Sequence, residues 1–172
     1  NFIVPQNKGD INRVIVGGLS GGGTGTWDFS IRHPLLTAAS TPISAASVGY
    51  GSSAGTLKWI PIWHFQGALD NAPHPNTSET LGNTLKNAGS NYRYSKYANV
   101  GHGCWGNAWA EADYFPYLRR ANKANPWTLF GQTEFCPGVP INVTIGVSAG
   151  FTEYQWRRNG EAYGGNTNET NV

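Results

Sequence analysis

The segment that most constrains the fold is residues 18–22, where Ser20 lies between Gly18 and Gly22, directly after the apolar run 13–17. A short continuous apolar run is typical of a buried strand, so the serine is predicted to lie on a sharp turn between a strand and a helix. Such a turn has room only if the residues two before and two after the serine lack side chains. Because the chain contains 23 glycines, the motif alone fits an ordinary glycine-rich loop equally well.

The remainder of the first 124 residues alternates between strand patterns and helix patterns. Apolar or alternating runs predict strands, and apolar residues three or four positions apart predict helices. The further strands are predicted at residues 43–50, 60–65 and 92–97, and the helices at 24–33, 76–88 and 107–122, the last bent or broken at Pro116. This alternation predicts an α/β fold, with a parallel sheet covered by helices on both faces.

Composition excludes several classes of protein. The 172 residues, 39% hydrophobic and 13% charged, suffice for one core and differ from a disordered or coiled-coil chain. The formal net charge of +2 is spread without a basic run, which indicates no nucleic-acid partner, and no apolar run reaches membrane-spanning length. The chain begins at Asn1, contains no methionine and has no signal-peptide pattern, so we expect a processed or truncated segment.

Two polar residues follow predicted strands at positions suited to chemistry. Asp70 comes shortly after the strand at 60–65, and His102 comes shortly after the strand at 92–97. The carboxyl ends of parallel strands share one edge of the sheet, where functional groups gather. Either residue alone is as easily a turn or loop residue. Together with Ser20, however, they follow the chain order serine, aspartate, histidine of a hydrolase triad.

The cysteines and the remaining histidines suggest structural roles. No disulfide is predicted between Cys104 and Cys136, and Cys104 is expected to be a small buried hydrophobic residue. A nucleophilic Cys104 paired with His102 is a weaker alternative to Ser20, because residues two apart rarely face each other. His64, inside a predicted strand, is expected in the core. The four histidines are scattered without metal-ligand spacing, so neither a metal nor a cofactor is expected.

With these residues in place, the chain resembles the α/β-hydrolase esterases related to poly(3-hydroxybutyrate) depolymerases and to feruloyl or acetyl-xylan esterases, a group that is also dienelactone-hydrolase-like or prolyl-oligopeptidase-like. The resemblance covers about residues 10–118 and rests on three segments, residues 13–28, 60–70 and 101–105. It departs at Gln66, where the family usually has histidine, and at Gly21, where it commonly has a larger residue. It implies the C-terminal half of the hydrolase sheet, starting at about the fifth of eight strands, with the N-terminal half missing.

The resemblance also implies roles for individual residues. Ser20 would attack an acyl carbonyl, His102 would move the proton, and Asp70 would orient the imidazole. The backbone N–H of Gly21 would stabilise the oxyanion, and the second donor would lie in the N-terminal half. Trp105 and His74 are candidates for lining the substrate site, with core packing and a solvated loop as the respective alternatives.

Beyond residue 124 the sequence changes character. Residues 125–135 are predicted to be a linker and residues 136–172 a second unit, with strands at 139–148 and 153–160, the latter running into an Asn-Gly turn. The segment resembles the opening of bacterial immunoglobulin-like repeats, in which a tryptophan, here Trp156, is buried in a sandwich. This resemblance implies a truncated all-β domain in a secreted or cell-surface protein, with association to a surface or polysaccharide.

The sequence therefore predicts a serine carboxylic-ester hydrolase that acts without a cofactor through an acyl-enzyme, on an ester of a carbohydrate, a phenolic acid or a short polyester. Two alternatives stay open. One is an oligopeptidase-type serine peptidase, which shares the triad and the fold. The other is a non-catalytic carbohydrate-binding or adhesion module on a degenerate hydrolase fold.

Overall fold

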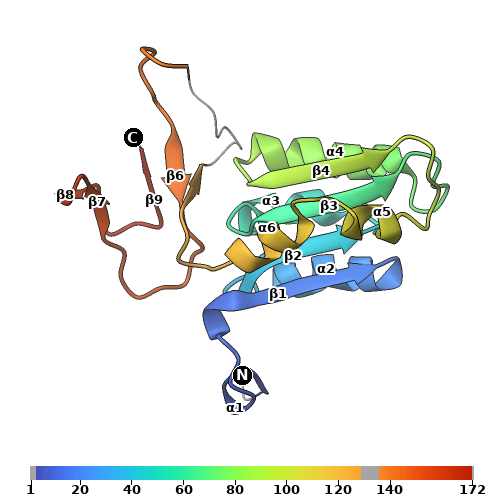
Figure 1. Cartoon of the computed structure of the whole chain (residues 1–172), viewed down its shortest axis with the longest axis horizontal. Coiled ribbons are helices and arrows are strands. Elements are labelled where there is room, and N and C mark those ends of the chain that lie inside the picture. The colour runs from blue at the N-terminus through green and yellow to red at the C-terminus, as the bar shows by residue number, and fades with distance from the viewer. Residues whose placement is uncertain (1–2, 129–135, 172) are drawn as a thin grey trace.

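The computed structural model of the chain describes residues 3–128 and 136–171. Its largest unit is a four-stranded sheet in which neighbouring strands are all parallel and lie in sequence order, formed by β1 (Val14–Leu19), β2 (Thr37–Ile43), β3 (Ile62–Gly67) and β4 (Tyr92–Tyr97). Helices cover both faces (Figure 1). The predicted parallel sheet with helices on both sides is confirmed.

The central strand β3 explains how two hydrophobic layers form. Side chains alternate between the faces of a strand. Ile62 therefore packs into one core with helices α2 (Gly21–Arg32), α3 (Ala54–Leu57) and α4 (Pro75–Asn87). Trp63 and Phe65 pack into the other core with α5 (Trp105–Trp109) and α6 (Tyr114–Arg120). All six residues of β3 are buried, as expected for a strand covered on both faces.

The second strand was predicted in the wrong place. The sequence pattern favoured residues 43–50, whereas β2 spans Thr37–Ile43 and every one of its residues is buried. β2 lies between two strands and under helices, and small side chains such as Ala39 and Ser40 fit there without forming an apolar run. Residues after Ile43 leave the sheet at once, because Ser44 has a positive φ of 47°.

The last predicted helix is two helices. The sequence predicted one helix over 107–122 with a bend or break at Pro116, but α5 ends at Trp109 and α6 begins at Tyr114. Pro116 lies in the first turn of α6, where its missing N–H costs no hydrogen bond. The helix predicted at 76–88 is confirmed as α4, and Gly89 ends it with a φ of 83°.

Short helical segments complete the unit. They are α1 (Ile3–Gln6), the 3-10 turn Ile11–Arg13 and the 3-10 turn Tyr50–Ser53. In the described part of the chain, no helix is long and apolar enough to cross a membrane.

The C-terminal residues form small antiparallel sheets. One contains β5 (Trp127–Thr128), β6 (Thr144–Gly146) and β9 (Glu169–Asn171), and the other is the hairpin of β7 (Trp156–Arg158) and β8 (Glu161–Tyr163). The predicted Asn-Gly turn is present, since Asn159 and Gly160 both have positive φ and connect β7 to β8.

The strand predicted at 139–148 and the predicted burial of Trp156 differ from the structure. The strand predicted at 139–148 is reduced to the three residues of β6, and Trp156 is half-buried in a two-stranded hairpin. Most of the predicted linker, residues 129–135, lies outside the described residues. Cys136 is exposed and Cys104 is buried, and both are free thiols in the structure as described.

Candidate active site

Ser20 lies at the sharp turn between β1 and α2. It is the residue between the end of β1 at Leu19 and the start of α2 at Gly21, and its φ of 54° and ψ of −120° are unusual for a residue with a side chain. Its backbone N–H donates to the Ile43 carbonyl at 2.9 Å, which ties the turn to the end of β2. The strand–turn–helix arrangement predicted from the sequence is confirmed.

The glycines around Ser20 differ in how crowded they are. A Cβ on Gly18 would overlap the backbone of Gly22, so the glycine two residues before the serine is required. A Cβ on Gly22 would meet nothing within 4 Å, so the prediction that this position needs a glycine for space was wrong. The crowded position on the helix side is Gly23, whose added Cβ would lie 2.8 Å from the Ile43 carbonyl oxygen and from Ala45.

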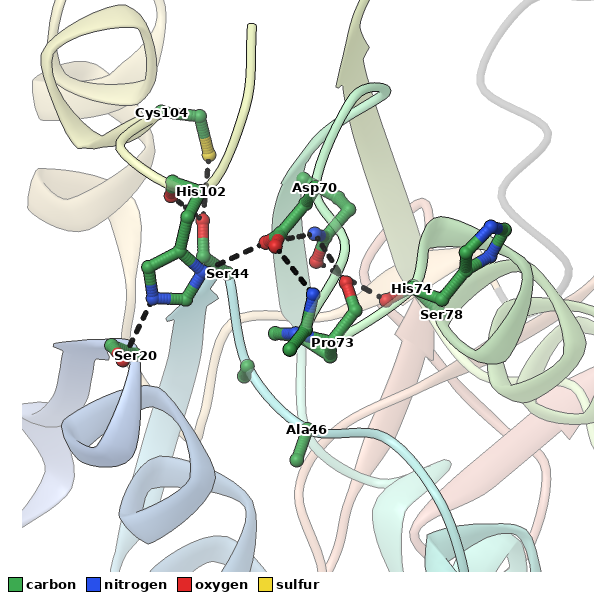
Figure 2. A network of polar contacts seen from close by, with 12 residues as sticks. Ser20, Ser44, Ala46, Asp70, Pro73, His74, Ser78, His102 and Cys104 are labelled. Carbon is green, nitrogen blue, oxygen red and sulfur yellow. Dashed lines mark hydrogen bonds and ion pairs between the residues drawn. The ribbon is translucent and has the colours of Figure 1, made fainter.

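Three polar side chains meet at the carboxyl end of the sheet (Figure 2). The Ser20 hydroxyl lies 2.9 Å from His102 Nε2, and His102 Nδ1 lies 2.8 Å from Asp70 Oδ2. The Asp70 side chain is 1% exposed and that of His102 is 39% exposed. Because a carboxylate has no proton to donate, Asp70 accepts the Nδ1–H of His102. This leaves Nε2 as the acceptor that faces the serine.

The Asp70 carboxylate is held by partners other than His102. The Ala72 N–H donates to Oδ1 at 2.9 Å, and Gln66 Nε2 donates to Oδ2 at 2.8 Å. A buried carboxylate is costly unless it is hydrogen-bonded, and here both oxygens have donors.

The loops that carry Asp70 and His102 are packed directly on each other. The Leu69 N–H donates to the Val100 carbonyl at 2.9 Å. A Cβ on Gly67 would overlap the carbonyl oxygens of Val100 and Gly101, so only glycine allows this approach. The close contact fixes the spacing between the acid and the imidazole.

Ser44 links the end of β2 to the histidine loop. Its hydroxyl donates to the His102 carbonyl at 2.6 Å and lies 3.1 Å from Cys104 Sγ. Cys104 is fully buried, and this burial raises the pKa of its thiol. A neutral thiol that faces Ser44 suits the expected packing role, whereas a nucleophile requires a thiolate.

The two candidate lining residues occupy different places. The Trp105 ring lies at right angles to the His102 ring, with 6.2 Å between ring centroids, so it borders the three polar side chains. His74 is exposed and caps α4, since its Nδ1 accepts from the Asn76 N–H at 3.3 Å. It lies on the far side of Asp70 from Ser20 (Figure 2).

The remaining candidates are structural or backbone groups. Gly21 is the first residue of α2, and its N–H belongs to the helical turn whose amides lack partners within the helix. His64 is fully buried, as expected, its Nδ1 lies 2.9 Å from the Tyr92 hydroxyl, and burial lowers its pKa to about 3. Within residues 3–128 and 136–171, no group of three or more metal-ligating side chains is present.

Two residues at this site were not singled out as functional from the sequence. Gln66 was noted only as a departure from the family pattern, and its buried contact with Asp70 gives that departure a physical meaning. No sequence pattern marked Ser44 as functional, because it falls within residues 43–50, which were wrongly predicted to be a strand.

Comparison with known proteins finds related hydrolases. No protein-family model matches the chain. A protein of Escherichia coli O157:H7 assigned as a carboxymethylenebutenolidase is 25% identical over 71% of this chain and 45% of its own length. A thermostable esterase of known crystal structure is 30% identical in sequence, with a TM-score of 0.62. The match covers 66% of this chain and 32% of the esterase chain.

Further solved structures share the fold. A protein from Klebsiella pneumoniae assigned as a dienelactone hydrolase is 23% identical, with a TM-score of 0.54, over 67% of this chain and 52% of its own. An acylaminoacyl peptidase from Pyrococcus horikoshii is 14% identical, with a TM-score of 0.61, over 72% of this chain and 26% of its own. The chain thus spans about half of the curated relative and between a quarter and about half of these structures.

Proposed function

We infer that this chain, which has the α/β-hydrolase fold, acts as a serine carboxylic-ester hydrolase. The observation that carries the proposal is the continuous series of contacts from the buried Asp70 through His102 to Ser20, at 2.8 and 2.9 Å. A serine on a strained turn, a base within hydrogen-bond reach and an acid that orients the base are the groups that acyl transfer requires.

In the first half of the reaction, the Ser20 oxygen attacks the ester carbonyl carbon while its proton moves to His102 Nε2. Asp70 stabilises the charged imidazole, and the oxyanion accepts a hydrogen bond from the Gly21 N–H at the start of the 12-residue helix α2. The bond to the leaving alkoxy group then breaks. The alcohol departs with the proton from His102, and the acyl group stays on Ser20.

In the second half, water replaces the alcohol. It attacks the acyl carbon and gives a proton to His102, the bond to the Ser20 oxygen breaks, and the serine recovers that proton. The products are one alcohol and one carboxylic acid, and Ser20, His102 and Asp70 return to their starting states.

Esters are favoured over peptides as substrates. A thermostable esterase that is 30% identical and a protein assigned as a carboxymethylenebutenolidase that is 25% identical are among the relatives. Three peptidase structures that share the fold are 14% to 16% identical. The Trp105 ring beside His102 suits a substrate with a flat apolar group, such as a phenolic ester, and carbohydrate and short polyester esters belong to the same proposal.

The test is intact-mass detection of a fluorophosphonate adduct on the protein produced from its whole gene. We expect one adduct that is absent from Ser20→Ala, and faster turnover of 4-nitrophenyl esters than of peptide amides. A folded protein without an adduct would overturn the hydrolase proposal and favour the non-catalytic module. An adduct together with faster turnover of peptides would point to the peptidase.

The division of the chain is also a proposal. We propose that residues 1–124 belong to the hydrolase domain, residues 125–135 link it to a second unit, and residues 136–172 are part of an immunoglobulin-like domain in a secreted or cell-surface protein. The Asn159-Gly160 hairpin supports an all-β unit. Fractionation of cells that express the whole gene tests the location, and recovery in the cytoplasm would contradict it.

A further inference from the structure

Gln66 is a fully buried polar side chain at the end of β3, in contact with the acid of the candidate site. Its Nε2 donates to Asp70 Oδ2 at 2.8 Å and to the Pro73 carbonyl at 3.2 Å, while its Oε1 accepts from the Ser78 hydroxyl at 3.3 Å. A buried amide with three partners is oriented rather than merely accommodated.

The partners allow only one orientation of this amide. The carboxylate and the carbonyl can only accept, so they require the NH2 group of Gln66, and the Ser78 hydroxyl can then donate to its oxygen. Ser78 is itself fully buried on α4, with its Oγ 3.1 Å from that of Ser47 in the loop after β2. Ser78 of α4 thus contacts Gln66 directly, and Ser47 in the loop after β2 contacts Ser78.

The consequence for Asp70 is that both carboxylate oxygens are anchored independently of His102. Oδ1 is held by the Ala72 N–H, and Oδ2, the oxygen that faces His102, is held by Gln66. The His102 side chain is 39% exposed and less constrained. An imidazole that exchanges protons in each half-reaction therefore meets a carboxylate in a fixed position.

We propose that Gln66 is a positioning residue for the hydrolysis described above, a step that rests on the proposed function. It holds Asp70 Oδ2 in line with His102 Nδ1, and because its amide is neutral it leaves the carboxylate charge free to stabilise the imidazolium. A lysine or arginine in the same place would offset that charge.

The first test compares Gln66→Leu with the unaltered protein on 4-nitrophenyl acetate. Loss of the donor frees Oδ2, so we expect kcat to fall by about 10- to 100-fold while KM changes by less than about twofold. Ser78→Ala removes only the support for the amide and should lower kcat by a smaller factor. An unchanged kcat in Gln66→Leu would overturn the proposal.

The second test is the pH profile of Gln66→Glu. The carboxyl group that this substitution introduces can donate to Asp70 when it is protonated, as the amide does, but not when it is ionised. Two carboxylates that share a buried site raise the pKa of one of them, so the kcat of the variant, divided by that of the unaltered protein at the same pH, should fall as the pH rises. The titratable or charged groups around this position include Asp70, which contacts Gln66, and His102, which contacts Asp70. Lys96 lies opposite Gln66 on β4 and pairs with Glu79 of α4, and the Cys104 thiol and the exposed His74 lie nearby. A uniform loss of kcat at every pH would indicate a structural role only.

Controls separate this inference from the proposed function. Ser30→Ala removes an equally buried helical hydroxyl that contacts Ser40 and not the site, so it should leave kcat unchanged. Thermal unfolding shows whether each variant folds, and if Gln66→Leu does not fold, the Gln66→Glu profile and Ser78→Ala decide the outcome. If the unaltered protein forms no Ser20 adduct, the proposed function fails. If it does and the Gln66 variants match it, only the positioning role fails.

Discussion

Ser20 illustrates how a few residues set the geometry of the site. A non-glycine residue at φ 54° and ψ −120° costs of order 1–3 kcal/mol, which the surrounding contacts must offset. The N–H of Ser20 is held by the carbonyl of Ile43, and Gly18 lies against the backbone of Gly22. Backbone contacts hold Ser20 in this strained conformation. A small substitution that displaces the backbone of the turn should therefore lower the stability of the protein more than the added volume alone would.

Alanine substitutions at the two flanking glycines should therefore differ sharply. Gly18→Ala must displace the turn, and we expect it to lower the free energy of unfolding by about 2 kcal/mol or more and to slow fluorophosphonate labelling of Ser20. Gly22→Ala places a methyl group in open space within α2 and should be neutral or stabilising by up to about 1 kcal/mol. Urea unfolding measures both, and equal stabilities would show that the turn is not crowded as described.

Much of the candidate site was predictable, because its acid and base follow strands that the sequence marks clearly. Tyr92–Tyr97 alternates as a strand should, and the prediction for it matches β4 residue for residue. The contacts of Ser44 and Gln66 were not predictable. That of Ser44 joins the segments after β2 and β4, and those of Gln66 join the end of β3 to the loop that follows it and to Ser78 of α4. Side chains that act through another residue leave no periodic pattern.

At the scale of elements, predictions succeeded where a strand or helix had one clear apolar pattern. β2 shows no such pattern, because burial on both faces between two neighbouring strands selects small residues, and because it contains Pro42, a residue type that is rare in central strands. The break between α5 and α6 occurs before Pro116, where the chain turns so that both helices pack against Trp63 and Phe65 of β3.

His64 of β3 affects the stability of the protein at low pH. His64 is buried against Trp27 and Tyr92, and burial lowers its pKa to about 3 from the ordinary 6.5. Below about pH 6.5 the unfolded chain binds a proton here that the folded chain does not. The contribution of the neutral, buried His64 to stability is therefore complete above about pH 6.5 and is lost progressively as the pH falls toward about 3.

The expected result is a fall in the free energy of unfolding by a few kcal/mol between pH 6.5 and 4, to which His64 contributes a large part. His64→Gln removes the titrating group, so its unfolding free energy should depend less steeply on pH over that range, whatever its absolute value. Urea unfolding at several pH values measures the slope. Parallel slopes for the two proteins would exclude His64 as a source of acid sensitivity.

At the scale of the whole molecule, the small C-terminal sheets contact the four-stranded sheet at the end opposite the candidate site. Lys123 is 8% exposed, and its Nζ donates to the Leu35 carbonyl at 2.6 Å, just before β2 begins. Its backbone N–H donates to the Asn12 carbonyl, and its carbonyl accepts from the Ser148 N–H. Asn12 and Leu35 precede β1 and β2, so Lys123 joins the C-terminal strands to the amino ends of the sheet. Figure 1 shows the C-terminal strands at that end of the sheet.

Removing the Lys123 ammonium should loosen the C-terminal unit without affecting chemistry at Ser20. Lys123→Met keeps an apolar stem but leaves the Leu35 carbonyl without its donor, a loss of about 1–3 kcal/mol. We expect faster hydrogen exchange in residues 144–171 and an unchanged rate of fluorophosphonate labelling. Lys96→Met is the matched control, because its ion pair with Glu79 is exposed and should contribute under about 1 kcal/mol. Slower labelling in Lys123→Met alone would mean that the contact at the amino ends of the strands is coupled to the site at their carboxyl ends.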